Sequence, residues 1–138
     1  MPTDDPPPHQ DTDWRSRARG ARVLAVDASN TDVLDQLVAL LLDPSDTAVT
    51  DETSAALLRR GDSAGVRPIA KAWAQAPDDE YRDHIYGQLV AHLRPTGSVG
   101  AFVRHCTILL DDTDPAVASG ARQLLAIAQP WADPHPAQ

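Results

Sequence analysis

Apolar side chains recur every three or four positions through most of the chain, which is the period of an amphipathic α-helix. One such stripe consists of Val99, Phe102, Val103, Cys106, Leu109 and Leu110. Three further stripes comprise Val33, Leu34, Leu37, Val38, Leu41 and Leu42; Tyr86, Leu89, Val90 and Leu93; and Val117, Ala118, Ala121, Leu124, Leu125 and Ala128. Breaks fall at Pro44, Pro77, Pro95 and Pro115. The pattern predicts an all-α fold with helices at about 31–42, 46–60, 63–76, 79–94, 97–110 and 114–128.

Acidic residues stand where several of these helices should begin. A side-chain oxygen at that position can accept hydrogen bonds from the free backbone N–H groups of the first turn. The residues are Asp46, Asp62, Asp78 and Asp114. Pro68, in contrast, lies within a helical stretch, where it either opens the helix at its first turn or kinks it.

The segment Arg22–Asp27, RVLAVD, permits two interpretations. It resembles the buried first strand of an α/β nucleotide-binding unit, but ASNTD follows it in place of a Gly-rich phosphate loop. Downstream the pattern contains no second strand. We therefore expect a helix over Trp14–Ala28.

Parts of the helical pattern repeat. Adding 68 to Leu41, Leu42 and Asp43 gives Leu109, Leu110 and Asp111. The same shift relates three more pairs, which are Asp46 and Asp114, Val49 and Val117, and Leu57 and Leu125. A middle copy, about 34 residues from each, keeps the two-helix plan with a slip of about one residue. This period, with two helices per unit, is typical of an α-solenoid.

The repeated residues resemble a known family. DPSDTAVTDETSAALLRRGD is similar to the second half of a HEAT repeat, in which an Asp-Pro turn leads to a helix with a Val, paired alanines, a Leu and a Gly-Asp close. DTDPAVASGARQLLAIA is similar to a second copy and PDDEYRDHIYGQLVAHL to a degenerate third. The family usually has an Arg after that Val, whereas here Thr50 and Ala118 take its place and only Arg82 restores it. The resemblance implies a short solenoid of about three HEAT-like hairpins over residues 31–129, with Trp14–Ala28 as an N-terminal capping helix.

In such solenoids the second helix of each hairpin lines a concave, partner-binding face. The resemblance therefore places candidate partner-binding residues on the central second helix, where polar residues recur every fourth position: Glu80, His84, Gln88 and His92. The flanking second helices would add Asp51, Glu52, Arg59 and Arg122.

Seven of the 12 prolines lie near the two ends of the chain. Such segments cannot bury enough apolar surface to offset the entropy of ordering them. We expect a helical repeat domain at 13–131 between mobile tails at 1–12 and 132–138. Within the domain, Trp73 should lie in the core and Trp131 should fold back over the last helix.

Charge narrows the classes of partner. The chain carries 12 Lys and Arg against 20 Asp and Glu, a net charge of −8. Nucleic-acid binding needs a cationic face, so the balance favours a protein partner with a basic surface. One exception is the cluster Arg15, Arg17, Arg19 and Arg22, which is either a solvated face or a contact for an anion or partner.

The sequence predicts neither a membrane-spanning segment nor a secretory signal. No apolar run approaches the roughly 18 residues that span a bilayer, and the start, MPTDDPPPHQDTD, is unlike a secretory signal. A single cysteine suits a reducing compartment. We expect a cytoplasmic protein.

The sequence predicts no metal, cofactor or catalytic set. His84 and His92 would be about 12 Å apart along one helix, too far to share a zinc ion. Glu80 and His84 would offer two ligands, with no matching pair elsewhere. Cys106 lies on an apolar stripe, and neighbouring helical side chains point about 100° apart, so His105 is poorly placed to activate it.

These observations predict a non-catalytic protein–protein interaction module, such as an adaptor, an assembly factor or an inhibitor of a cationic toxin. The alternative is an enzyme or enzyme subunit of HEAT-like fold that acts on a small ligand or a nucleobase. A third possibility is a structural part of a larger assembly. A cationic groove would favour nucleic acid, and a deep apolar pocket would favour a small ligand.

Overall fold

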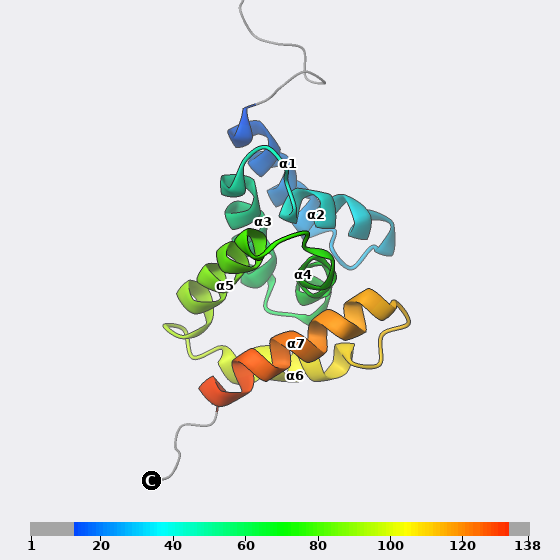
Figure 1. Cartoon of the computed structure of the whole chain (residues 1–138), viewed down its shortest axis with the longest axis vertical. Helices are drawn as coiled ribbons and strands as arrows, with labels where there is room; N and C mark the ends of the chain where they lie inside the picture. The colour runs from blue at the N-terminus through cyan, green and yellow to red at the C-terminus, as the bar shows by residue number, and fades with distance from the viewer. Residues whose placement is uncertain (1–12, 133–138) are drawn as a thin grey trace, which may run out of the picture.

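The chain is all-helical in the computed structural model, which describes residues 13–132 (Figure 1). Seven α-helices, one 3-10 turn and no strand occur in this range. They are α1 (Trp14–Val26), η2 (Thr31–Val33), α2 (Leu34–Leu41), α3 (Thr47–Arg60), α4 (Ser63–Gln75), α5 (Asp79–Leu93), α6 (Val99–Leu109) and α7 (Pro115–Ala132). The all-α prediction is confirmed, and the strand considered for RVLAVD is wrong, because that segment belongs to α1 and the turn after it.

Each of the six predicted helices lies within two residues of its expected bounds, except at the start of α2, where residues 31–33 form the 3-10 turn η2, and at the end of α7. That helix continues through Pro130 to Ala132, so Ala132 is helical rather than part of a tail. The predicted tails otherwise lie outside the described residues.

The predicted helix starts are confirmed by their hydrogen bonds. The side chains of Asp46, Asp62 and Asp78 accept from backbone amides at the starts of α3, α4 and α5, at 2.8, 2.9 and 3.0 Å. Asp114 does the same for the amide of Ala116 in α7, at 3.0 Å. Each bond satisfies a donor that the first turn of a helix leaves free. Pro68 lies inside α4, five residues after its start, so it does not open the helix.

Two helices, α3 and α4, occupy the middle of the molecule (Figure 1). α3 packs against α1 on one side and α5 on another, and α4 packs against α2, α6 and α7. The helices α2, α4 and α6 are thus successive neighbours, as are α3 and α5.

The last hairpin, α6 with α7, departs from this order. α7 packs most extensively along α4 and α6, rather than extending the row of α3 and α5. Figure 1 shows α7 crossing beneath the end of α4. Gly120 of α7 is buried directly against the backbone of Ala70 in α4, a close approach that the missing side chain permits.

The core is formed by the predicted stripes, with one correction. Phe102, Cys106, Val117 and Leu124 are buried as expected, as is Trp73. On α5, however, the buried residues are Ile85, Leu89 and Leu93, whereas Tyr86 is 42% exposed. The stripe predicted for this helix was rotated because Ile85 and Tyr86 are adjacent and both are large and apolar.

Tyr86 has a different contact. Its ring meets the ring of Trp131 edge to face, with centroids 5.6 Å apart. The guanidinium of Arg94 lies over the Trp131 ring, 5.9 Å from its centroid. Trp131 therefore joins α7 to α5 and does not fold back over its own helix.

Ion pairs fasten the turns to distant helices. Arg17 of α1 binds Asp43 at 2.8 Å, and the same buried carboxylate accepts from the amides of Ser45 and Asp46. Among the four clustered arginines, Arg17 thus has a structural role. Of the other three, Arg15 pairs with Asp13, Arg19 donates to Ser16, and Arg22 pairs with Glu52.

The turn between α6 and α7 is held by α4. Arg67 donates twice to Asp112, at 2.8 and 3.1 Å, and Lys71 binds Asp114 at 2.8 Å and Asp35 at 3.1 Å. Hydrogen bonding to Arg67 lowers the pKa of Asp112, and hydrogen bonding to Lys71 lowers the pKa of Asp114, in each case against the effect of burial. Both carboxylates therefore favour the folded state while they are ionised.

This arrangement predicts a loss of stability in acid. Because the folded pKa values are depressed, the contribution of both groups is fully present above the unfolded pKa of about 3.9 and is lost as pH falls through the folded values. We expect the free energy of unfolding, measured by urea titration between pH 2 and 6, to fall less steeply below about pH 4 in Asp112→Asn/Asp114→Asn. Asp83→Asn, at an exposed carboxyl of α5, should keep the wild-type slope; equal slopes in all three proteins would contradict the assignment.

Candidate functional site

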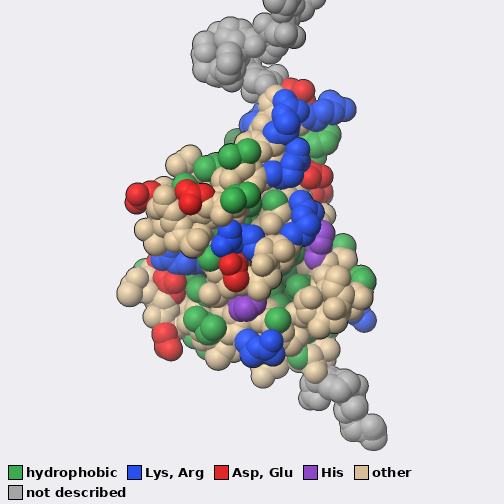
Figure 2. All heavy atoms as spheres, turned by 180° about the vertical axis from the view of Figure 1, so that it is seen from behind, with side chains coloured by type: hydrophobic (Ala, Val, Ile, Leu, Met, Phe, Trp, Pro, Cys, Tyr) green, Lys and Arg blue, Asp and Glu red, His purple; other side chains and the backbone are tan. Residues whose placement is uncertain are grey.

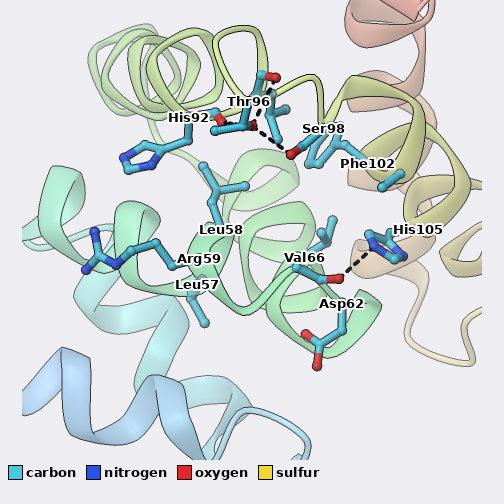
Figure 3. A pocket seen from close by; sticks show the side chains of 13 residues that line it. Leu57, Leu58, Arg59, Asp62, Val66, His92, Thr96, Ser98, Phe102 and His105 are labelled. Atoms are coloured by element: carbon cyan, nitrogen blue, oxygen red, sulfur yellow. Dashed lines mark hydrogen bonds between the residues drawn. The ribbon is translucent and has the colours of Figure 1, made fainter.

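A cleft of about 370 Å³ lies where the ends of four helices meet (Figure 3). The C-terminal ends of α3 and α5 and the N-terminal ends of α4 and α6 form its walls. These ends come together because both turns that link one hairpin to the next, at 61–62 and 94–98, lie on the same side of the molecule.

The floor of the cleft is apolar. It is formed by buried side chains from all four helices, namely Leu57, Leu58, Val66, Leu93 and Phe102. They belong to the main core, so the cleft opens directly onto the packed interior. Such a floor offers favourable burial to an apolar group of a ligand.

Polar side chains form the rim. Figure 3 shows Arg59 and His92 on one side of the cleft and Asp62 and His105 on the other. His105 Nε2 lies 3.2 Å from the carbonyl oxygen of Gly61, which fixes that ring. The hydroxyls of Thr96 and Ser98 lie 2.7 Å apart.

The charges of the rim are unequal. Asp62 is paired with Arg60 through two hydrogen bonds, at 2.9 and 3.1 Å. Burial raises the pKa of Asp62, but the hydrogen bonds from Arg60 and the Gly65 amide outweigh it, and the pKa is lowered. Arg60 also donates to the last carbonyls of α1, at Ala25 and Val26. By contrast, Arg59 is exposed and forms no ion pair with any described residue.

Most of the predicted partner-binding residues of α5 lie along its contact with α3. His84 Nδ1 is 3.0 Å from the Asp51 carboxylate, and His92 Nε2 is 3.1 Å from the Gln88 side-chain oxygen. Glu80 lies on the same face at the start of α5, exposed to solvent. We call Asp51, Glu80, His84, Gln88 and His92 the α3–α5 seam. His92 belongs to both the seam and the cleft.

The remaining predicted residues are distributed differently. Arg59 lines the cleft, as described. Glu52 points toward α1, where it lies 3.4 Å from Arg22. Arg122 is exposed on α7, which is packed against α4 and α6, and no described contact connects it with the seam.

The sequence did not identify four rim residues as candidate site residues, namely Asp62, Thr96, Ser98 and His105. His105 was weighed only as a partner for Cys106, and Asp62 only as a helix cap. The available signal was that two polar inter-hairpin turns, Gly61-Asp62 and Thr96–Ser98, recur at one end of successive hairpins.

The other side chains with reactive potential have structural surroundings. Cys106 is fully buried, and burial raises the pKa of its thiol to about 12. A thiol of this kind is a poor nucleophile at neutral pH. Between residues 13 and 132, no group of three or more His, Cys, Asp and Glu side chains is placed to hold a metal ion. In the same range, every helix is too short or too polar to cross a membrane.

A second, smaller cavity adjoins the cleft. It measures about 190 Å³, lies between α1 and α3, and shares Arg59 with the cleft. Its other lining residues are Arg22, Ala25, Val26, Ala56 and Arg60. Figure 2, which shows the molecule from behind, has many Lys and Arg side chains along its upper part, histidines lower down, and further Lys and Arg side chains beside and below the histidines.

Comparisons of the sequence with protein-family models and curated proteins, and of the structure with solved structures, found no significant match. The resemblance to HEAT repeats therefore rests on the residues quoted above and on the helix order. The function must be inferred from the seam, the cleft and their charges.

Proposed function

We propose that this protein is a non-catalytic protein–protein interaction module that receives an extended segment of its partner along the α3–α5 seam and in the adjoining cleft. The observation that supports the proposal is the continuity of these two features. His92 forms the end of the seam, through its contact with Gln88, and also the rim of the cleft beside Arg59.

The composition of this surface suits recognition. Interfaces commonly combine an apolar centre with a polar rim, and ligand-binding clefts have volumes of about 300–1,000 Å³. The cleft has both properties, with Leu58 and Phe102 in the floor and Arg59 and His92 at the rim. A side chain of the partner would bury its apolar part there, while the seam would contact the rest of the segment.

We further propose that the fold is a short HEAT-like solenoid that begins with α1 as a cap. The neighbour relations of α2, α4 and α6, and of α3 and α5, support this classification. The position of α7 against α4 limits the regular stack to the first two hairpins. The partner-binding face would then consist of α3 and α5, without α7 and its Arg122.

The start of α5 suggests the sign of part of the partner. Asp79, Glu80 and Asp83 are exposed there, and among residues 13–132 only Asp79 of these three forms an ion pair, with Arg82 at 3.0 Å. A basic surface of the partner would be attracted to this end of the seam. Such attraction speeds association and weakens as salt rises.

Site-specific photo-crosslinking tests the location of the interface. A benzophenone side chain at Gln88, in the seam, should crosslink one defined protein in the cells from which the chain comes. The control is the same group at Ile108, which is 62% exposed on α6, away from the seam. Equal crosslinking from both positions would contradict the proposal.

Charge reversal then tests the energetics with the identified partner. Glu80→Lys/Gln88→Lys should weaken binding by about tenfold, since the change at Glu80 turns attraction to the basic region of the partner into repulsion and the change at Gln88 removes the amide that contacts His92 in the seam. Asp111→Lys, at an exposed carboxyl of the α6–α7 turn, is the matched control and should leave affinity unchanged. Thermal melting should be nearly the same for all three proteins. Full affinity of the double variant would overturn the role of the seam, and tight binding to duplex DNA at physiological salt would favour the nucleic-acid alternative.

The cleft also supports a second candidate, which is the binding of a small ligand. Its volume and apolar floor favour this function. Base recognition commonly uses stacking on aromatic rings or on Arg guanidinium planes. The cleft offers Phe102, which is 2% exposed in the floor, and the rim side chains His92, His105 and Arg59. Competition with a small apolar acid, described below, separates this candidate from the first.

A further inference from the structure

The cleft differs in charge from the protein as a whole. The described residues contain all 12 Lys and Arg and 16 of the 20 Asp and Glu, so the folded part is acidic on average. At the rim, however, Arg59 has no acidic partner among the described side chains, and its other polar side chains apart from Asp62 are His92, Thr96, Ser98 and His105, none of which carries a negative charge. The one carboxylate, Asp62, is already neutralised by Arg60.

The helix ends around the cleft add to this asymmetry. Ser98 precedes α6 without forming a side-chain cap, because its hydroxyl is paired with Thr96. The first-turn amides of α6 therefore keep their capacity to donate. Of the residues that carry them, Ala101 lines the cleft, whereas Val99 and Gly100 line a separate cavity beside Trp131. Free amides and the helix dipole favour a negative charge at such a position.

The C-terminal ends of α3 and α5 carry partial negative charge, but several of their carbonyl groups already accept hydrogen bonds. The carbonyl of Gly61, after α3, is bonded to His105, and that of Leu58 accepts from the Gly61 amide. At the end of α5, the carbonyl of Leu93 accepts from the Ser98 amide, and that of His92 from the Thr96 hydroxyl. The cleft therefore has spare donors in Arg59 and the Ala101 amide, while these four carbonyl acceptors are in use.

We infer that the cleft receives an apolar side chain flanked by a carboxylate, both supplied by the partner's docking segment. The inference rests on the proposed function and adds the chemistry of the anchor. The apolar group packs on the floor between Leu58 and Phe102. The carboxylate lies at the rim, where the Arg59 guanidinium can donate two parallel hydrogen bonds.

The inference also gives the partner two distinct parts. Its anchor is apolar and acidic, whereas the region that faces the start of α5 is basic. Two ends of opposite sign fix the direction in which the segment lies along the seam, because reversal would place like charges together at both ends.

Two fluorescent probes of matched shape test the chemistry of the cleft. 8-Anilinonaphthalene-1-sulfonate is an apolar anion, and N-phenyl-1-naphthylamine is the same framework without the charge. We expect the anion to bind the full-length protein at one site, and Arg59→Gln to raise its Kd about fivefold, the loss expected for one partly solvated charged contact. The Kd of the neutral probe should change less than twofold in Arg59→Gln. Arg122→Gln, the matched control on α7, should leave the Kd of both probes unchanged.

A blocking variant locates the probes. Ala101 lines the cleft and is only partly buried, so Ala101→Phe should fill the space and abolish binding of both probes. Its melting temperature is compared with that of the wild type to show that it folds. Undiminished binding of the anion to Arg59→Gln, or of either probe to a folded Ala101→Phe, would overturn the site.

Peptide competition then identifies the source of the anchor. Two blocked peptides that differ only in Phe-Glu against Phe-Gln are added to the protein with the bound anionic probe. Displacement by the Phe-Glu peptide alone supports the inference. Equal displacement by both peptides overturns the recognition of charge. Displacement by octanoate but by neither peptide shows that the ligand is not a protein segment, and it counts against the proposed function. If instead the Phe-Glu peptide displaces the probe but Glu80→Lys/Gln88→Lys binds the partner with full affinity, the result counts against the seam alone.

Discussion

Replacement of Phe102 by Ala is expected to lower the free energy of unfolding by about 3–5 kcal/mol, the usual cost of truncating a buried Phe. The residue is the only Phe in the sequence and is 2% exposed in the first half of α6. Its ring also forms part of the floor of the cleft, and the helix that carries it packs against α4 and α7, so truncation would weaken both features. Urea unfolding, monitored by circular dichroism, measures this decrease in the free energy of unfolding.

The same helix provides the control. Ile108 is 62% exposed, so Ile108→Ala should change the free energy of unfolding by no more than about 0.5 kcal/mol. Phe102→Leu should cost less than Phe102→Ala, because it leaves a smaller cavity. A loss of under about 1 kcal/mol for Phe102→Ala would show that the ring is not packed as described.

The local parts of the fold could be predicted because their causes are local. The stripe of α6 and the break at Pro115 after it depend on residues within a few turns of one another. The caps at Asp46, Asp62 and Asp78 depend on a carboxylate and amides two or three residues away. Helix bounds were therefore close to those of the structure.

The packing of one helix against another depends on residues far apart in sequence, and here the predictions were weaker. The repeat spacing gave no sign that α7 lies against α4. Tyr86 and Trp131 meet across 45 positions, so neither residue alone indicates the contact that replaces the expected fold-back of Trp131.

The candidate site shows the same limit. The polar residues of α5 could be found from their spacing, because every fourth residue of a helix shares a face. The cleft could not, because it is formed by four helix ends. His105 and Asp62 are 43 positions apart in the sequence, and the turn geometry alone brings them to one rim.

The position of α7 leads to the last prediction. Gly120→Ala should destabilise the protein by at least about 2 kcal/mol, since a methyl group there would collide with the carbonyl of Ala70, and a backbone cannot move aside as a flexible side chain can. The sign is informative, because in most exposed helical positions Gly→Ala is stabilising by about 0.5–1 kcal/mol.

Gly87 provides that comparison within the same protein. It is exposed in the middle of α5, and a methyl group there would contact nothing within 4 Å. Gly87→Ala should therefore raise the free energy of unfolding by up to about 1 kcal/mol, while Gly120→Ala lowers it. If both variants were stabilised, α7 could not lie against α4 as closely as described. The last hairpin would then be free to extend the row of α3 and α5, and Arg122 would return to the proposed partner-binding face.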